Sequence, residues 1–404
     1  MPPSRPNYFA GLTRNTFLLA AGSFFADIST EMLYPILPIF LTQTLRANGS
    51  IVGLIEGAAQ ATQNIVQGIS GSLSDRLNRH KAIAMAGFVA AALAKPLMGL
   101  ATAWEGVLGA RLLDRVGTGT RSAPRDALVA ESVDEKDRGR AFGLEGFGDN
   151  AGAFVGPLMA LVLLFWWQIR IRTVFYLAVI PGLLAFAMVT LVRERPAMVA
   201  AKTKIDVGPK EFPAAYWKYL LVTTIFGIGN SSNAFLILQT RDIGASLPVT
   251  ILIYAAFNLV AALISYPAGS LSDRWGRKTL LLAAYVIFLV TYLAFALTHS
   301  VAVIGLAFAG YGLFQGMFRA VGKAFATDFA PSGLRASAVG WYNTVVGLLG
   351  LFASVVAGLL WDRFGHEAVF FYGAASAAAG CIALVAMLPA GCAGTATRDD
   401  QKVS

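Results

Sequence analysis

The chain is dominated by apolar runs of about the length that crosses a lipid bilayer. Hydrophobic residues make up 56% of its 404 residues and charged residues only 14%, whereas a soluble domain carries about 25% charged residues. A spanning helix needs roughly 20 mostly apolar residues, and about twelve such runs occur along the chain. Because so little polar surface remains for a soluble fold, we predict an all-α membrane protein with twelve transmembrane helices.

A half-length repeat divides these runs into two sets. The hexapeptide Gly-Ser-Leu-Ser-Asp-Arg occurs at Gly71–Arg76 and again at Gly269–Arg274, 198 residues later. Four charged residues that follow the first copy, Arg121, Arg125, Glu131 and Arg138, are echoed at offsets of 197–198 residues by Arg319, Lys323, Asp328 and Arg335. Such a repeat in an apolar chain predicts two pseudo-symmetric six-helix bundles. The expected division is 1–193 for the first bundle, 194–214 for a cytoplasmic linker, 215–390 for the second bundle and 391–404 for a cytoplasmic tail.

The distribution of basic residues predicts the orientation in the membrane. With both termini inside, 20 of the 32 Lys and Arg fall in inner loops and tails, five in outer loops and seven within the predicted spans. This bias follows the positive-inside rule, so the net charge of +9 records orientation rather than affinity for nucleic acid. We therefore expect a monomeric, multi-pass protein of the bacterial inner membrane, surrounded by lipid, with both termini in the cytoplasm.

Several other function classes lack the residues that they need. The chain has two cysteines, Cys381 and Cys392, and its three histidines, His80, His299 and His366, fall in predicted loops. This set provides neither a disulfide framework nor a soft-metal site. The chain also has no Gly-x4-Gly-Lys-Ser/Thr loop for ATP. We therefore expect no enzymatic activity, no metal and no cofactor, and we expect an ion gradient to supply the driving force.

The repeated loop resembles the signature loop of the major facilitator superfamily. The pattern Gly-x-Leu-Ser-Asp-Arg-x-x-Arg stands between predicted spans 2 and 3, and its copy stands between spans 8 and 9. The resemblance covers nearly the whole chain and implies a secondary transporter that works by alternating access. It also implies a conformational latch formed by Gly71, Asp75, Arg76, Arg79, Gly269, Asp273, Arg274 and Arg277. The alternative is that the loop only enforces topology, since arginines are favoured at the negatively charged inner surface.

A second motif lies in predicted span 141–166 and resembles the glycine motif of the efflux branch of this family. The matching residues are Gly143, Gly152, Gly156 and Pro157, while Ala160 and Leu161 replace the two glycines at the motif's end. Gly152 and Gly156 allow another helix to approach closely, and Pro157 removes a backbone hydrogen bond. Ordinary tight packing explains these residues as well as antiport does, but the full spacing favours efflux. Residues 27–38 also resemble a bacterial subgroup of exporters.

Ionisable residues inside the predicted spans are candidates for proton coupling, because a charge within the bilayer is costly and is functional by default. At 1.5 Å per residue, Asp27 lies about 16 Å from the inner face and Arg115 about 16 Å from the outer face of a core of roughly 30 Å. We therefore predict that Asp27 faces Arg115 and that Glu31 faces Arg111. An acid that separates from its arginine gains proton affinity. The predicted coupling set is Asp27, Glu31, Arg111, Asp114, Arg115, Glu145 and Asp149.

Packing is the alternative role for these ion pairs, although buried ion pairs are poor sources of stability. The second half offers mainly neutral polar residues, which suggests that it makes more of the substrate contacts. The predicted substrate-cavity residues are Tyr34, Asn230, Asn233, Gln315 and Asn343. We expect proton-coupled efflux of a small organic compound. The alternatives are a proton-coupled metabolite importer and a membrane receptor or sensor without transport.

Overall fold

The computed structural model describes residues 11–77, 79–134, 137–194, 212–330 and 334–388, and every regular element in these ranges is a helix. By its contacts the chain divides into two units, Met1–Phe40 with Thr62–Thr203, and Leu41–Ala61 with Lys204–Ser404. The all-α prediction is confirmed for the described residues. Most of the predicted linker and the whole predicted tail lie outside them.

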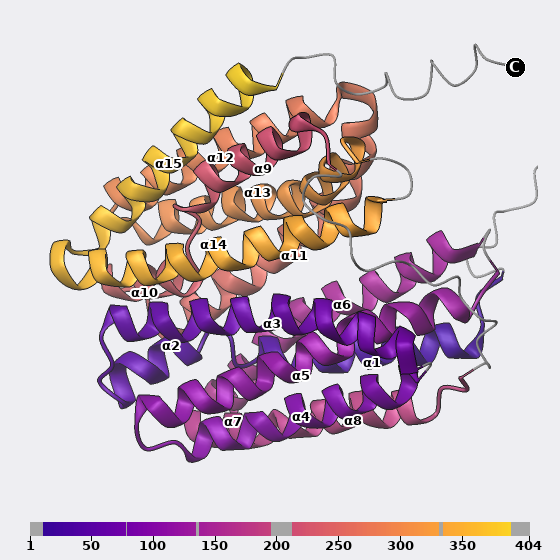
Figure 1. Ribbon diagram of the computed structural model, residues 1–404. Coiled ribbons are helices and arrows are strands. Elements are labelled where there is room, and N and C mark those ends of the chain that lie inside the picture. The colour runs from indigo at the N-terminus through magenta and orange to yellow at the C-terminus, as the bar shows by residue number, and fades with distance from the viewer. Residues whose placement is uncertain (1–10, 78, 135–136, 195–211, 331–333, 389–404) are drawn as a thin grey trace, which may run out of the picture. The chain divides into compact units, whose positions relative to one another are not determined.

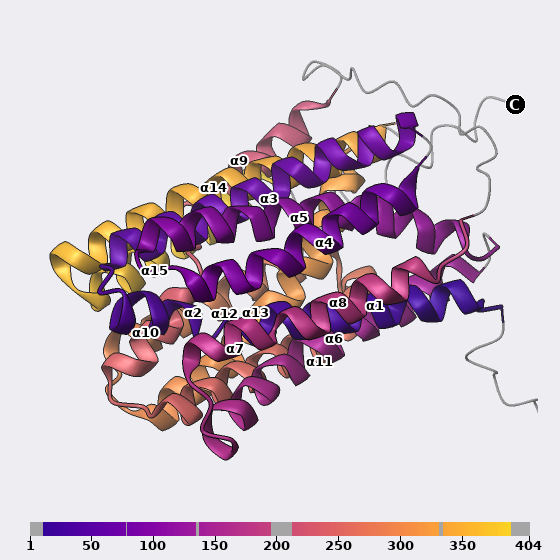
Figure 2. The same ribbon diagram turned by 90° about the horizontal axis from the view of Figure 1, so that it is seen from below.

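The first unit is a bundle of antiparallel helices (Figure 1). Its elements are α1 (Arg14–Glu31), α2 (Leu37–Ile39), the second half of α3 (Gly49–Leu77), α4 (His80–Leu100), α5 (Trp104–Glu131), α6 (Arg138–Leu161), the π-helix η3 (Val162–Trp166), α7 (Ile171–Leu177) and α8 (Val179–Thr190). Within this unit α4 packs against α5 and α8, and α1 packs against α6 and α8 (Figures 1 and 2). The faces of α1, α4, α5 and α6 that meet in this way carry the charged residues of the candidate site.

The second unit is also helical. It begins with the π-helix η1 (Phe40–Thr44) and the first half of α3, and it continues with α9 (Ala214–Gly227), α10 (Ala234–Asp242), α11 (Leu247–Trp275), α12 (Arg277–Leu297), α13 (Val301–Asp328), α14 (Arg335–Phe364) and α15 (His366–Met387). Here α13 packs against α11 and α12, and α15 packs against α9 and α12.

Eight helical segments of the described chain are long and apolar enough to cross a membrane by length and composition. They are His80–Leu100, Arg140–Trp166, Ile171–Thr190, Leu247–Ser265, Arg277–Leu297, Val301–Asp328, Ala338–Phe364 and His366–Met387. The remaining predicted spans are either interrupted or rich in polar residues. The first breaks after Glu31, ahead of Pro35, and the seventh breaks between Gly227 and Ala234, while α5 carries several buried charges.

Equivalent polar contacts in the two units support the internal repeat. His80 Nε2 lies 3.4 Å from the Oε1 atom of Glu131 in the first unit. The residues 197 positions later, Arg277 and Asp328, form the same contact in the second unit, with Nη1 2.7 Å from Oδ1. In both halves, this contact joins the start of one helix to the end of the next helix.

The lysines that follow these residues are also equivalent. The Nζ atom of Lys81 donates to the carbonyl oxygens of Thr190 (2.8 Å) and Val192 (2.7 Å) at the end of α8. Its counterpart Lys278 donates to the carbonyl oxygen of Leu388 at the end of α15. Lysine at a helix C-terminus satisfies carbonyl groups that have no partner within the helix, and the repeat preserves this function.

Small residues bring the first half of α3 into backbone contact with α14. A Cβ atom added to Gly53 would collide with the carbonyl group of Ser354, and one added to Gly358 would collide with the backbone at Gly49. These positions recur every four residues on both helices, which is the spacing that lets two helices approach closely in a membrane.

At the start of α3, a residue of α14 also caps the helix. The side-chain carboxylate of Asp362, near the end of α14, accepts hydrogen bonds from the backbone N–H groups of Gly49 (2.7 Å) and Ser50 (2.8 Å). The first N–H groups of a helix have no partner within it, and the positive end of its dipole favours an anion. Asp362 therefore stabilises the start of α3 from a residue more than 300 positions away in the sequence.

Candidate functional site

A single buried carboxylate on α5 is surrounded by three cations. The Oδ1 atom of Asp114 lies 2.5 Å from Lys95 Nζ, and its Oδ2 atom lies 2.6 Å from Arg115 Nη2 and 3.4 Å from Arg111 Nη1. Asp114 is fully buried and Lys95 is 1% exposed. We call these four residues the Asp114 cluster. Because it holds three positive charges and one negative charge, the cluster has a formal surplus of positive charge.

Two glycines bring α4 and α5 close enough to form this cluster. A Cβ atom added to Gly87 of α4 would lie 2.6 Å from the carbonyl oxygen of Gly117 on α5. Lys95 lies two turns beyond Gly87, and Asp114 lies three residues before Gly117. Since the two helices are antiparallel neighbours, this spacing places the lysine opposite the carboxylate.

A second group of charges lies further along α5, on the side that meets α1 and α6. The Nη1 atom of Arg125 lies 2.9 Å from Glu145 Oε1 and 3.4 Å from Asp149 Oδ1. The Nη2 atom of Arg121 lies 3.7 Å from Asp27 Oδ1. We call these five residues the Arg125 cluster. It contains three carboxyl groups and two guanidinium groups, so carboxyl groups are in excess. The Nη2 atom of Arg125 also lies 3.0 Å from Oδ1 of Asp126, the next residue on α5, which is more exposed.

Glycines on α6 hold the acids of the Arg125 cluster against α1. A Cβ atom on Gly152 would lie 2.9 Å from the Cβ atom of Asp27, and one on Gly156 would lie 2.8 Å from the backbone nitrogen of Met32. The predicted close approach at these two glycines is therefore confirmed. Pro157 lies inside α6, whereas a Cβ atom at Gly143 would meet open space.

A serine of α1 joins α5 and α6 at the same place. The Oγ atom of Ser23 donates to Glu145 Oε1 (2.8 Å) and accepts from Arg125 Nη1 (2.9 Å). The neighbouring carboxyl group of Asp149 is more open, with 40% of its side chain exposed. The Arg125 cluster therefore has a buried acid and a half-exposed acid that share one arginine.

The prediction that Asp27 faces Arg115 is wrong. Arg121 forms the ion pair with Asp27, and Arg115 instead contacts Asp114 and donates to Gln63 Oε1 of α3 (2.9 Å). The cause is that equal depth does not determine which face of a helix a residue occupies. Charged residues of both clusters share one face of α5, where residues recur at alternating spacings of three and four. This face carries Arg111, Asp114, Thr118, Arg121 and Arg125.

The predicted pairing of Glu31 with Arg111 stays a prediction. Arg111 is almost fully buried, and its guanidinium carbon lies 5.6 Å from the centre of the Tyr34 ring. Cation–π contact of this kind favours the charged guanidinium group within the bilayer. Tyr34, which we predicted in the substrate cavity, is therefore a neighbour of the Asp114 cluster.

Neutral and aromatic side chains build much of the interior of the second unit. Asn233 Oδ1 accepts a hydrogen bond from the hydroxyl group of Tyr311 (2.8 Å). With its amide oriented toward Arg319, Gln315 accepts hydrogen bonds of 3.0 and 3.2 Å from that guanidinium group. Asn230 and Asn343 are half-buried.

Stacked aromatic rings also lie in the second unit. Phe226 stacks on Tyr285, and Phe288 stacks on Tyr292, each with ring centres 3.9 Å apart. The two units therefore differ as the sequence indicated, with buried charge networks in the first and an aromatic, weakly polar interior in the second.

The residues of the predicted latch occupy different environments. Arg76, Arg79 and Arg274 are exposed, while the side chains of Asp75 and Asp273 lie outside the described part of the structure. Exposed arginines at these positions agree with a loop at a charged surface.

Of the other latch residues, Gly71 and Arg277 contact neighbouring helices, whereas Gly269 does not. A Cβ atom on Gly71 would lie 3.1 Å from that of Ala123 on α5, whereas one on Gly269 would have no neighbour within 4 Å. Arg277 is held by Asp328, as described above. The basic end of the second copy is thereby tied to α13.

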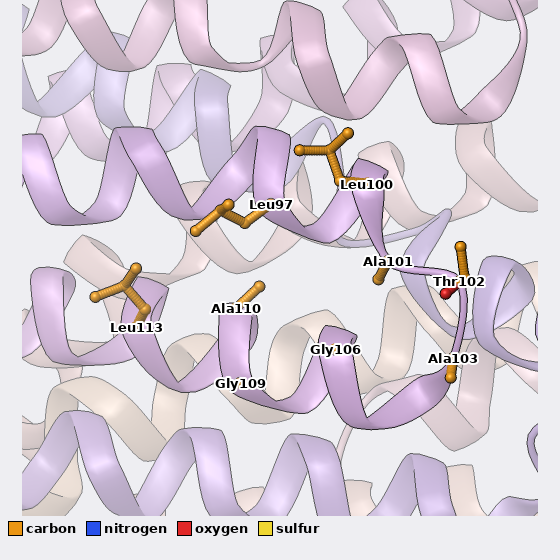
Figure 3. Close-up of a pocket in the computed structure, with 9 residues that line it drawn as sticks. All are labelled: Leu97, Leu100, Ala101, Thr102, Ala103, Gly106, Gly109, Ala110 and Leu113. Atoms are coloured by element: carbon orange, nitrogen blue, oxygen red, sulfur yellow. The ribbon is translucent and has the colours of Figure 1, made fainter.

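An apolar crevice of about 400 Å³ opens between the end of α4 and the start of α5. Figure 3 shows Leu97, Ala110 and Leu113 pointing into it. The full lining is Leu97, Leu100, Ala101, Thr102, Ala103, Gly106, Gly109, Ala110 and Leu113. Because no ionisable side chain lines it, the crevice suits apolar groups and takes no part in either charge cluster.

Comparison with known proteins identifies the architecture. The family profile of the Major Facilitator Superfamily matches residues 19–226 and again residues 219–397, so each half of the chain matches it separately. The chain is 34% identical over 369 residues to an uncharacterised MFS-type transporter of Methanocaldococcus jannaschii, covering 90% of this chain and 92% of the relative.

Two other relatives have more specific names. A probable 4-methylmuconolactone transporter of Cupriavidus pinatubonensis is 26% identical over 370 residues, which is 87% of this chain and 85% of the relative. The multidrug resistance protein MdtG of Enterobacter lignolyticus is 28% identical over 289 residues, which is 68% of each chain. Among solved structures, the nucleoside transporter NupG superposes with a TM-score of 0.74 at 14% identity, covering 93% of this chain and 99% of that one.

Proposed function

The chain belongs to the major facilitator superfamily, and from this premise we propose that it exports a small organic compound in exchange for protons by alternating access. Its fold is the all-α fold of this superfamily, and its general function is transport across a membrane. The coupling ion, the direction and the residues that carry the proton belong to the proposal. We place both termini in the cytoplasm and the protein, as a monomer, in a bacterial inner membrane.

The Arg125 cluster is the observation that carries the proposal. Three carboxyl groups of α1 and α6 share two arginines of α5 inside the helical bundle of the first unit. Burying this many charges contributes little to stability, so a role in transport explains their presence better than packing does. The carboxyl groups outnumber the guanidinium groups, which gives the cluster a place to hold a proton.

The geometry of Arg125 supports a mechanism for release and uptake. Arg125 contacts Glu145 at 2.9 Å and the more exposed Asp149 at 3.4 Å. A carboxyl group close to a guanidinium group favours the ionised form, and a buried carboxyl group without one favours the neutral form. A movement of α6 along α5 that exchanges these contacts would therefore load a proton on one acid while it expels a proton from the other.

The direction of transport rests on two lines of support. The glycine face of α6, Gly152 and Gly156, packs against Asp27 and its neighbours on α1, which links the efflux-type motif to the charged site. MdtG, one of the named relatives, is described as a multidrug resistance protein. The alternative is a proton-coupled importer, since the name of the Cupriavidus relative gives a small organic compound without a direction.

A growth assay tests this proposal. An efflux-deficient bacterial strain that overexpresses the chain is grown with each compound of a panel of organic compounds. We expect increased resistance to at least one compound, and we expect the Arg125→Gln variant to lose it at equal membrane abundance. Increased sensitivity would indicate import instead. Uptake of that compound into inside-out vesicles with an acidic lumen then measures the direction, because an exporter accumulates it there.

A further inference from the structure

A small cavity lies inside the first unit, between the two charge clusters. It is lined by Ala26, Ser29, Thr30, Phe88, Ala91, Ala92, Lys95, Arg121 and Gly182. Lys95 belongs to the Asp114 cluster and Arg121 to the Arg125 cluster. The space open to the centre of a water molecule is about 10 Å³, which is close to the minimum for one water and too small for an organic ligand.

Arg121 brings hydrogen-bond donors to this cavity that the described residues leave unused. Its side chain is only 5% exposed, and one nitrogen, Nη2, contacts Asp27. Its Nε and Nη1 atoms are buried and have no hydrogen-bond partner within the described part of the chain. A buried donor that lacks a hydrogen-bond partner is destabilising, so such groups usually bind ordered water.

Lys95, which also lines the cavity, offers a further donor. Its ammonium group donates to Asp114 (2.5 Å) and to Thr30 Oγ1 (3.1 Å), and an ammonium group has three donors in all. Ser29 supplies an acceptor, because its hydroxyl proton is given to the carbonyl oxygen of Ala178 (2.6 Å) and its lone pairs remain available.

We propose that this cavity binds one water molecule that accepts hydrogen bonds from Arg121 and Lys95 and donates to the Ser29 hydroxyl oxygen. Apolar cavities of this size stay dry, whereas polar ones that offer two to four partners hold water. The bound water joins the Asp114 cluster and the Arg125 cluster into one hydrogen-bonded network through α1, α4 and α5.

Through this network, the positively charged Asp114 cluster is linked by hydrogen bonds to the acids of the Arg125 cluster. A change in protonation near Asp27 alters the position of Arg121, and the water transmits this change to Lys95. The existence of the water site follows from the cavity and its donors alone. Its part in coupling rests on the proposed function.

Gly182 provides a way to displace the water with one methyl group. A Cβ atom at Gly182 would lie 3.0 Å from Ala92 Cβ and 3.2 Å from Ser29 Oγ, both of which line the cavity. Gly22 is a matched control on the same pair of helices, since a Cβ atom there would lie 3.3 Å from Val189 Cγ2 and Gly22 does not line the cavity.

The test is a structure of the full chain at a resolution that shows ordered water, for the wild type, Gly182→Ala and Gly22→Ala. We expect a water peak within hydrogen-bond distance of Lys95 and Arg121 in the wild type and in Gly22→Ala, and its loss in Gly182→Ala. An empty cavity in a wild-type map that shows water at other buried sites overturns the proposal. This result does not depend on transport, so it is separate from a failure of proton coupling.

The pH dependence of transport tests the part that the water plays. We expect Gly182→Ala to shift the pH of half-maximal transport relative to Gly22→Ala. A water peak together with an unchanged pH profile would retain the site and overturn its role in coupling. A wild-type protein whose transport ignores pH would overturn the proposed function and leave the water site standing.

Discussion

Lys95 and Asp114 form an ion pair inside the first unit, with 2.5 Å between Nζ and Oδ1 and with each side chain at most 2% exposed. Such a pair is costly to bury, and it is more costly to leave one of its members without the other. Because Arg111 and Arg115 also contact Asp114, the acid is the centre of the group and each cation is one of three partners.

This arrangement predicts unequal effects of removing the two partners. Asp114→Asn leaves three buried cations without their anion and should destabilise the protein by about 3–5 kcal/mol. Lys95→Met leaves Asp114 with two arginines and should cost less. Thermal unfolding of the purified variants measures both, with Glu105→Gln as an exposed carboxylate on the same helix that should change stability by less than about 0.5 kcal/mol. A larger loss in Lys95→Met than in Asp114→Asn would contradict the central place of Asp114.

A double-mutant cycle separates the observed partner of Asp27 from the one that depth alone suggested. Asp27→Asn and Arg121→Gln should show a coupling energy of about 0.5–3 kcal/mol in thermal unfolding, because their side chains are in contact. Asp27→Asn and Arg115→Gln should be additive within about 0.5 kcal/mol. Coupling with Arg115 and none with Arg121 would favour the arrangement that the structure excludes.

The fold was predictable from the sequence because its determinants are repeated and continuous. Apolar runs of spanning length predicted the helices, and the copies at Gly71–Arg76 and Gly269–Arg274 predicted the equivalence of the halves. That equivalence holds down to single contacts, as His80 with Glu131 and Arg277 with Asp328 show.

The site was predictable in its composition but only partly in its pairing. Counting residues along a helix gives depth, and depth selected Arg115 for Asp27. The side of the helix depends on packing, and here Gly87 and Gly117 set the rotation of α5 against α4. The contact of Asp362 with α3 had no signal in the sequence, since it joins residues more than 300 positions apart.

The cap that Asp362 provides can be tested by two substitutions at one position. Asp362→Ala removes both acceptors, Oδ1 for the N–H group of Gly49 and Oδ2 for that of Ser50, and should cost about 0.5–2 kcal/mol. Asparagine keeps only one acceptor oxygen. Thermal unfolding should therefore show the lower Tm for Asp362→Ala and a smaller loss for Asp362→Asn. Equal losses in both variants would mean that a single retained hydrogen bond does not stabilise the start of α3.

The proposed latch predicts an effect on transport without a large effect on stability. Arg277 and Asp328 are each about one-quarter exposed, so their ion pair should contribute no more than about 1 kcal/mol to stability. Arg277→Gln should lower the transport rate while leaving membrane insertion and Tm nearly unchanged. Arg363→Gln, an exposed arginine outside the loop, serves as the control. Full transport in Arg277→Gln would indicate that this part of the loop only enforces topology.

Proton coupling through the Arg125 cluster is tested most directly by transport in proteoliposomes that carry an imposed pH gradient, with a compound identified in the growth screen. The variants are Asp27→Asn, Glu145→Gln and Asp149→Asn, and Glu105→Gln is the matched carboxylate outside the cluster. We predict that at least one cluster variant loses gradient-driven accumulation yet still binds the compound and exchanges it between the two sides, while Glu105→Gln accumulates it normally. Full gradient-driven accumulation in all three cluster variants would contradict the account.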